Sequence, residues 1–170
     1  MLMLQSITQK GGLAFNCFSW AFLITKIYCM KISEIDSIIK TVNKYGTGIT
    51  NGDIELLRSA FHPKAMMYGC SGDNVTIVEI GGLFAYVASQ KPPVVSGEQH
   101  RSIIKNIDVS GNCASAEVLQ ENCYGVNYIN YFQLLKIEGQ WLIVSKAYDV
   151  VVEDKIIDET KTATKELKTV

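Results

Sequence analysis

The sequence predicts a small α+β domain with a pocket, in which a long helix and two shorter ones precede an antiparallel sheet. Three observations support this class: an early apolar stripe with helical spacing, later runs of strand-forming residues, and turn residues between them. Helices massed before an antiparallel sheet pack on one of its faces. With 170 residues, the chain has the length of one domain and can bury most of its apolar surface.

The long helix is expected to begin just after Met30. Ser33 and Asp36 form a capping pair, because a hydroxyl accepts from free amide groups and an acid suits the first turn. Apolar residues then recur at spacings of three and four: Ile35, Ile38, Ile39, Val42, Tyr45 and Ile49. This stripe predicts a helix with one buried face, and Asn51-Gly52 ends it.

Two shorter helices are expected further along the chain. Asp53 caps the first, from Ile54 to Phe61, and His62-Pro63 ends it because the residue before proline avoids the helical region. The second contains the apolar residues from Leu83 to Val87, and Pro92-Pro93 terminates it.

A short strand pair lies between these two helices, and long strands follow them. The short pair is predicted at residues 65–70 and 75–78, and the first two long strands at 101–109 and 114–124. Turns that contain glycine separate the members of each pair. The sheet is therefore built mostly from the second half of the chain.

The stretch from Tyr128 to Val150 predicts a hairpin around Glu138-Gly139, because glycine takes the positive φ that a tight turn needs. Regular pairing places Phe132 opposite Ser145. Since side chains alternate along a strand, the inner face carries Tyr128, Asn130, Phe132, Leu134, Trp141, Ile143, Ser145, Ala147 and Asp149. The outer face carries Ile129, Tyr131, Gln133, Leu135, Leu142, Val144, Lys146 and Tyr148. Both faces are largely apolar, so both are expected to be covered.

The two ends of the chain differ from the domain predicted at residues 31–152. Residues 1–30 are apolar, but the run from Leu13 to Tyr28 is shorter than a spanning helix and carries Lys26. This favours an extension upstream of Met30 as the true start, with a membrane-directed leader as the alternative. Residues 153–170 form a charged, threonine-rich tail without apolar periodicity, which indicates a frayed helix or disorder.

Composition narrows the possible partners. A formal net charge of −1 and the lack of interleaved basic and aromatic residues argue against nucleic acid. Five cysteines without a Cys-x-x-Cys spacing, and two distant histidines, supply no metal site, and no glycine-rich phosphate loop is present. No cofactor is therefore expected. The cysteines indicate a reduced, cytoplasmic protein, or an exported or membrane-associated one if the leader is genuine.

Several motifs occur in an order that resembles nuclear transport factor 2-like proteins. The string from Ile49 to Ala65 carries the first part; Ile107 to Ala114, Asn130 to Lys136 and Gly139 to Val144 are similar to the putative lumazine-binding branch, close to polyketide-cyclase-like (SnoaL-like) members. The resemblance implies a curved sheet closed by helices into a cone, with a cavity at its wide end and often a homodimer through the outer sheet face. It implies no single reaction, because this fold hosts isomerases, cyclases, dehydratases and binding modules. The branch commonly has a carboxylate where this chain has Asn130, and an amide cannot take a proton.

Two residues are candidates for proton transfer. Asp149 is predicted on the inner face, where apolar surroundings raise the pKa of a carboxylate and suit it as a base, although solvent or a loop can also satisfy a strand end. His62 is the other candidate, because the unperturbed pKa of a histidine suits acid–base work near neutrality. At a helix-to-strand corner, however, it can instead cap the second helix. Tyr68 or Tyr128 would steady the oxyanion of a bound carbonyl compound.

The remaining candidates line the predicted pocket. The expected ligand-binding residues are Tyr45, Tyr68, Tyr128, Asn130, Phe132, Trp141 and Ser145. Phe132 and Trp141 are expected to pack against the long helix as core residues first. With few convergent ionisable groups, this face favours a small-molecule-binding domain that is dimeric through its outer face. The alternatives are an isomerase, cyclase or dehydratase that acts on a carbonyl compound by proton transfer, and a non-catalytic protein-interaction scaffold.

Overall fold

The computed structural model describes residues 17–151, with side chains from residue 32 onward. In chain order the elements are α1 (Cys17–Asn51), α2 (Ile54–Ala60), β1 (Phe61–Ser71), β2 (Asn74–Glu79), α3 (Gly81–Ser89), α4 (Pro93–Ser96), β3 (Arg101–Ser110), β4 (Cys113–Cys123), β5 (Val126–Ile137) and β6 (Gln140–Val151). The strands form one sheet in the order β2-β1-β6-β5-β4-β3. Only the β1–β6 pair is parallel among these strands, so the sheet is mixed, and the predicted α+β class is confirmed.

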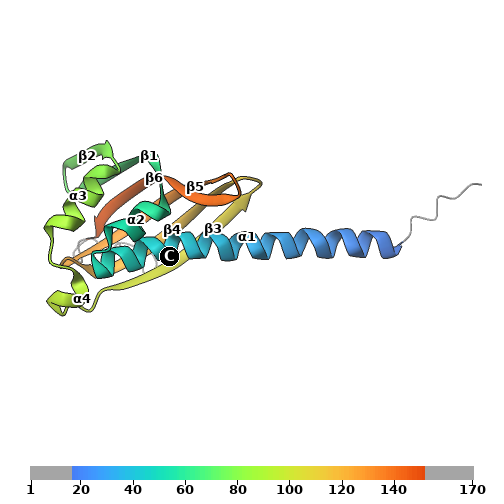
Figure 1. Cartoon of the computed structure of the whole chain (residues 1–170), viewed down its shortest axis with the longest axis horizontal. Coiled ribbons are helices and arrows are strands. Elements are labelled where there is room, and N and C mark those ends of the chain that lie inside the picture. The colour runs from blue at the N-terminus through green and yellow to red at the C-terminus, as the bar shows by residue number, and fades with distance from the viewer. Residues whose placement is uncertain (1–16, 152–170) are drawn as a thin grey trace, which may run out of the picture.

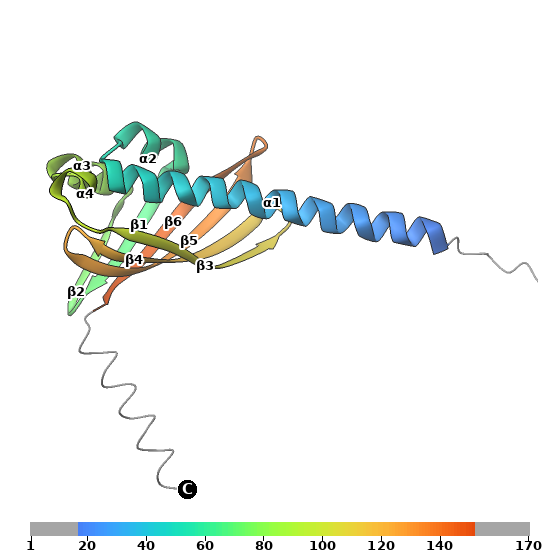
Figure 2. The ribbon, with the colours of Figure 1, turned by 90° about the horizontal axis from the view of Figure 1, so that it is seen from below.

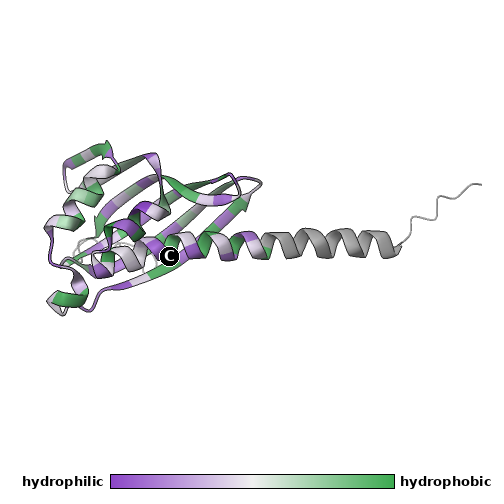
Figure 3. Cartoon of the chain, viewed as in Figure 1, coloured by the Kyte–Doolittle hydropathy of each residue, from purple (hydrophilic) through white to green (hydrophobic). Residues whose placement is uncertain are grey.

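Helices cover one face of the curved sheet. The C-terminal half of α1 crosses that face, α2 and α3 lie at the same end, and the N-terminal half of α1 extends past the sheet (Figures 1 and 2). The predicted stripe supplies the buried contacts of α1, since Ile38, Val42, Tyr45 and Ile49 are all buried. Apolar and polar residues alternate along the strands, as a sheet with one covered face requires (Figure 3).

Aromatic rings fill the core between α1 and the sheet. Phe132 on β5 meets Tyr45 edge to face, with 4.9 Å between ring centroids, and Phe61 packs against Tyr45 and Phe84 at 6.0 Å in each case. Trp141 is buried in the same core. Edge-to-face packing adds to the free energy gained from burial.

The predicted start of α1 at Ser33 is wrong, because α1 already begins at Cys17. Residues 17–32 contain neither glycine nor proline, so nothing in the sequence stops the helix before the predicted cap. Ser33 lies inside the helix, and its carbonyl accepts a hydrogen bond from Ser37 Oγ at 2.8 Å. Residues 1–16 of the predicted extension and the predicted tail after Val151 lie outside the described residues. Within residues 17–151, every helix is too short or too polar to cross a bilayer.

The shorter helices follow the prediction closely. Asp53 caps α2, with its Oδ1 accepting from the Leu56 N–H at 2.9 Å. The helix ends at Ala60, one residue earlier than expected, because the backbone is already extended at Phe61, ahead of Pro63. The prolines after α3 do more than end it, since Pro93 begins the short helix α4.

The β5–β6 hairpin has the predicted turn but a different register beyond it. Both turn residues have positive φ, 51° at Glu138 and 81° at Gly139, as a tight hairpin requires. Leu134 then pairs with Ile143, whereas Gln133 pairs with Ser145, so Val144 is left over as a bulge in β6.

The bulge exchanges the two faces of β6. Phe132 pairs with Lys146 instead of Ser145, and Asn130 pairs with Tyr148. Because the side-chain period of a strand is two, one extra residue turns every later side chain over. Lys146, Tyr148 and Val150 therefore face inward, and Ser145, Ala147 and Asp149 face outward. The predicted inward placement of Ser145 and Asp149 is wrong.

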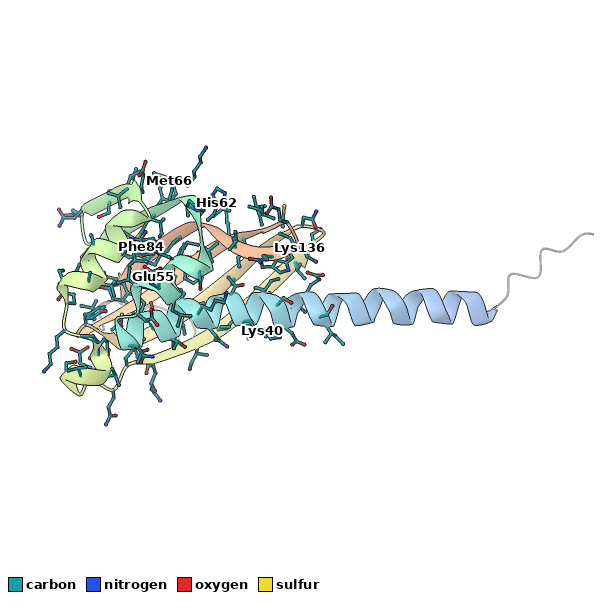
Figure 4. The ribbon with its side chains drawn as sticks, in the orientation of Figure 1. Lys40, Glu55, His62, Met66, Phe84 and Lys136 are labelled. Atoms are coloured by element: carbon teal, nitrogen blue, oxygen red, sulfur yellow. The ribbon has the colours of Figure 1, made fainter. Side chains whose placement is uncertain are left out.

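A carboxylate on α1 forms hydrogen bonds with the turn end of this hairpin. Glu34 accepts from Lys136 Nζ and from Trp141 Nε1, each at 2.6 Å, and Lys136 lies beside α1 in Figure 4. These hydrogen bonds lower the pKa of the Glu34 carboxyl. About two turns further along α1, Thr41 Oγ1 donates to the Trp141 carbonyl at 2.9 Å. These hydrogen bonds hold the turn end of the hairpin, rather than its opposite end, against α1.

Candidate functional site

A cavity of about 470 Å³ lies between α1, α3 and the inner face of the sheet. Its walls are mainly apolar and aromatic, and five tyrosines contribute to them: Tyr45, Tyr86, Tyr124, Tyr128 and Tyr148. The polar side chains in the wall include Gln120, Asn130 and Lys146. An apolar hollow with few placed polar groups is typical of a small-molecule site.

Lys146 is the cationic residue in this wall. Its side chain is only 4% exposed, and it forms no hydrogen bond or ion pair with any residue from 32 to 151. Burial lowers the pKa of Lys146 to about 7, an effect that the neighbouring Cys123 opposes. Burial also raises the pKa of the Cys123 thiol to about 12, so this neighbour stays protonated. A lysine in these surroundings holds a neutral, nucleophilic amine near pH 7.

The ring of Tyr148 supports this amine. Lys146 Nζ lies 4.0 Å from the centroid of the Tyr148 ring, where the π face attracts positive charge. Gly69 on β1 pairs with Tyr148, and a Cβ at Gly69 would collide with the ring. Tyr128 meets the same ring edge to face at 5.8 Å. The absence of a side chain at Gly69 thus leaves the space that the Tyr148 ring occupies beneath Lys146 Nζ.

A chain of hydrogen bonds links Thr50 and His100 to Gln120 in the cavity wall. Thr50 Oγ1 donates to the Gly46 carbonyl at 2.9 Å, so it must accept from His100 Nδ1 at 2.8 Å. His100 Nε2 is then an acceptor, and Gln120 Nε2 donates to it at 3.2 Å. Burial lowers the pKa of His100, with Glu98 opposing, which agrees with a neutral ring that has this tautomer.

The other end of Gln120 faces the cavity wall. Gln120 Oε1 accepts from the Tyr45 hydroxyl at 2.7 Å and from Asn130 Nδ2 at 3.0 Å. Asn130 Nδ2 also approaches the Val118 carbonyl at 3.4 Å. Asn130 Oδ1 has no partner, although it is buried; among the described residues, Glu98 Oε2 is the other side-chain atom in this state.

The structure places three of the predicted pocket residues in the cavity wall. Tyr45, Tyr128 and Asn130 line the cavity, as predicted. Phe132 and Trp141 are buried in the core behind it, in keeping with their expected packing against α1, and neither contributes to the wall.

Four other predicted residues lie outside the cavity. Asp149 and Ser145 lie on the outer face because of the bulge, and Tyr68 shares that face and is 41% exposed. His62 lies near the start of β1, away from α1 (Figure 4), and its Nδ1 accepts from the Lys64 N–H at 3.1 Å. The structure therefore does not assemble the predicted arrangement of a base at Asp149 or His62 with a phenol across the cavity.

Sequence reasoning missed the residues that carry the polar chemistry of the wall. Lys146 and Tyr148 were assigned to the outer face, and Gln120 and His100 were given no role. One signal was present for Gln120, which has the same strand parity as the buried Ala116 and Val118. No comparable signal marks Lys146, because its face depends on the bulge.

Comparison with known proteins shows the family. The profile of the putative lumazine-binding proteins matches residues 33–149. The chain belongs to this family. An NTF2-like protein of unknown function from Shewanella baltica OS155 is 31% identical, with a TM-score of 0.66 over 72% of this chain and 97% of that one. A second, from Methylobacillus flagellatus KT, is also 31% identical, with a TM-score of 0.66 over 71% and 94% of the two chains.

This member of the putative lumazine-binding family also resembles a curated protein. The protein named Aldolase FrzH, from a Cladobotryum species, is 27% identical over 116 residues, which are 68% of this chain and 90% of that protein. Together these similarities confirm the NTF2-like fold, whose members include many chemistries.

Proposed function

We propose that this putative lumazine-binding protein is an aldolase-type enzyme, in which Lys146 forms a Schiff base with an aldehyde or ketone bound in the cavity. The observation that carries the proposal is an almost fully buried amine in the wall of an apolar cavity, without a carboxylate partner among residues 32–151. Lysines used as Schiff-base nucleophiles need this desolvation, because it keeps the amine neutral. The name of the relative Aldolase FrzH supports the same class of reaction.

The surroundings of Lys146 suit each step of such a reaction. The neutral amine attacks the carbonyl carbon to give a carbinolamine. The carbinolamine hydroxyl takes a proton from water and leaves as water, which gives an iminium ion. Cleavage of the bond between the α and β carbons sends its electron pair into the iminium, while the β-hydroxyl loses its proton to water and an aldehyde leaves. Protonation of the resulting enamine and hydrolysis return the ketone and the amine. The Tyr148 ring, 4.0 Å from Nζ, stabilises the positive charge of the iminium.

Reductive trapping tests the proposal directly. Incubation with benzaldehyde and cyanoborohydride should label Lys146, with peptide mass spectrometry as the readout. The labelling rate should rise from about pH 6 to about pH 8, because attack requires the neutral amine and the pKa of Lys146 is about 7. Lys105 is the internal control: its hydrogen bond to Glu117 raises its pKa, so it should label far more slowly over this range.

Binding without reaction is the second candidate function. The apolar, tyrosine-rich wall favours it, since such a cavity holds a ligand whether or not Lys146 reacts. A ligand that raises the melting temperature but never labels Lys146 would select this candidate over the aldolase-type enzyme.

The outer sheet face supports a homodimer, which we propose as the assembly of this chain. A row of paired residues crosses the sheet on this face, from Ile77 through Tyr68 and Ala147 to Tyr131. Three large members of the row are exposed: Ile77 by 64%, Tyr68 by 41% and Tyr131 by 50%. A contiguous exposed apolar surface of this kind is typical of an interface.

Light scattering during size-exclusion chromatography should give the mass of a dimer for the unmodified chain and of a monomer for Tyr131→Lys. The new charge would be buried without a partner in the interface. Val94→Lys makes the same kind of change at an exposed residue of α4 and should leave the dimer intact. A monomeric unmodified chain would contradict the proposal.

A further inference from the structure

The orientation of the Asn130 amide is fixed from both ends of the hydrogen-bonded chain. At one end, the Gly46 carbonyl can only accept, so the Thr50 hydroxyl donates to it and accepts from His100 Nδ1. His100 Nε2 is then an acceptor, so the side-chain amide of Gln120 must point its NH₂ group at it. At the other end, Asn130 Nδ2 faces two oxygen atoms, Gln120 Oε1 and the Val118 carbonyl. Reversing the Asn130 amide would place oxygen against oxygen at both contacts.

This orientation leaves Oδ1 as an unused acceptor in Asn130, a residue of the cavity wall. The residue has no solvent exposure, it contributes to the cavity wall, and Oδ1 has no partner among the described residues. Buried polar atoms are almost always paired, and an unpaired one is costly. A hydrogen-bond donor on the bound molecule would satisfy it.

Asn130 and Lys146 lie on the same face of the sheet, and both contribute to the cavity wall. Asn130 pairs with Tyr148, and Lys146 pairs with Phe132, so Asn130 and Lys146 are diagonal neighbours on β5 and β6. Diagonal partners on one face are about 7–8 Å apart at their Cα atoms. Lys146 Nζ lies over the ring of Tyr148, the residue opposite Asn130.

We infer that the cavity selects carbonyl compounds that carry a hydroxyl or amine donor one or two carbons from the carbonyl, with Asn130 Oδ1 as the acceptor that recognises the donor. The inference rests on the proposed function of Lys146. Asn130 is a specificity-determining residue in this account: an amide accepts the hydrogen bond but takes no proton. The hydroxyl of a β-hydroxy ketone, the product of an aldol addition, meets this requirement.

The test compares ketones of matched size by reductive trapping. Hydroxyacetone and butanone differ only by a hydroxyl in place of a methyl group, and a second pair, hydroxylated one carbon further out, tests the spacing. In the unmodified chain, half-maximal labelling of Lys146 should need at least about tenfold less of the hydroxylated ketone in one pair. Asn130→Leu should abolish this preference, so that the hydroxylated ketone and its methyl counterpart label Lys146 equally. Asn106→Leu, the same change at an exposed residue of β3, should keep the preference.

The possible outcomes separate this inference from the proposed function. Equal labelling by both members of each pair in the unmodified chain would overturn the role of Asn130 and leave the Schiff base standing. A preference that survives Asn130→Leu would also overturn it. No labelling of Lys146 by any ketone or by benzaldehyde would overturn the proposed function, and the inference with it. The comparison in the unmodified chain holds even if Asn130→Leu does not fold.

Discussion

Replacing Lys146 by methionine is expected to raise the melting temperature of the protein while abolishing reductive trapping. The reason is that Lys146 is buried without a counter-ion in the described part of the chain, so folding must either strip its charge of water or release its proton. Methionine has a similar length and no charge, and it suits an apolar cavity. Loss of the amine removes the only group at this position that can form a Schiff base.

The sign and size of this effect follow from the pKa. The pKa of Lys146 is about 7 in the folded protein, against 10.5 for an ordinary lysine. The folded state therefore binds fewer protons between these values, and Lys146 opposes folding fully below pH 7 and progressively less as the pH rises toward 10.5. A shift of this size corresponds to roughly 3–5 kcal/mol. For a chain of this length, the gain at pH 6 is several degrees or more.

Differential scanning calorimetry at pH 6 and at pH 9 would check this expectation, with a larger gain at the lower pH. Lys136→Met is the matched control, since Lys136 donates to Glu34 and its removal leaves that carboxylate without a cationic partner. This control should lower the melting temperature or leave it unchanged. A fall in melting temperature for Lys146→Met at both pH values would contradict the buried, unpaired state of the amine.

A gain in stability on removing Lys146 would itself bear on function. Groups that oppose folding and still occupy a cavity wall are typical of sites where chemistry needs a strained or desolvated residue. Lys146 shares this feature with Asn130, whose Oδ1 is buried and unpaired. The two features lie on adjacent strands and face one cavity.

Local signals in the sequence predicted the fold well. The Glu138-Gly139 turn, the Asp53 cap and the stripe from Ile38 to Ile49 each depend on a few neighbouring residues, and the structure contains all three. The start of α1 was missed for a related reason. A serine is favoured as a cap, but it does not end a helix that can continue on both sides of it.

The site was predicted only in part, because its geometry depends on a bulge that leaves no clear trace in the sequence. Val144 is an ordinary strand residue in a hairpin whose two faces are both largely apolar. The alternation that normally fixes register is therefore weak there. Regular pairing places Ser145 opposite Phe132, the position that Lys146 occupies in the structure. Tyr45 and Asn130 were placed correctly because they lie on α1 and β5, which the bulge in β6 does not affect.

Replacing Gln120 by leucine is expected to destabilise the fold by about 2–4 kcal/mol. Three buried or half-buried groups would each lose a hydrogen-bond partner at once: the Tyr45 hydroxyl, Asn130 Nδ2 and His100 Nε2. Leucine fills a similar volume, so the loss would reflect unpaired polar groups rather than a cavity. Urea denaturation followed by tryptophan fluorescence would measure the free energy of unfolding.

Two further variants show whether the loss comes from the hydrogen-bonded chain. Gln140→Leu makes the same change at an exposed residue beside the β5–β6 turn and should shift the free energy of unfolding by less than about 0.5 kcal/mol. Tyr45→Phe removes one partner of Gln120, so the double variant should lose less stability than the sum of the two single variants. Strict additivity would mean that Tyr45 and Gln120 do not act together. In that case the chain from His100 would not hold the Asn130 amide in place, and the selection of a donor beside Lys146 would lose its structural basis.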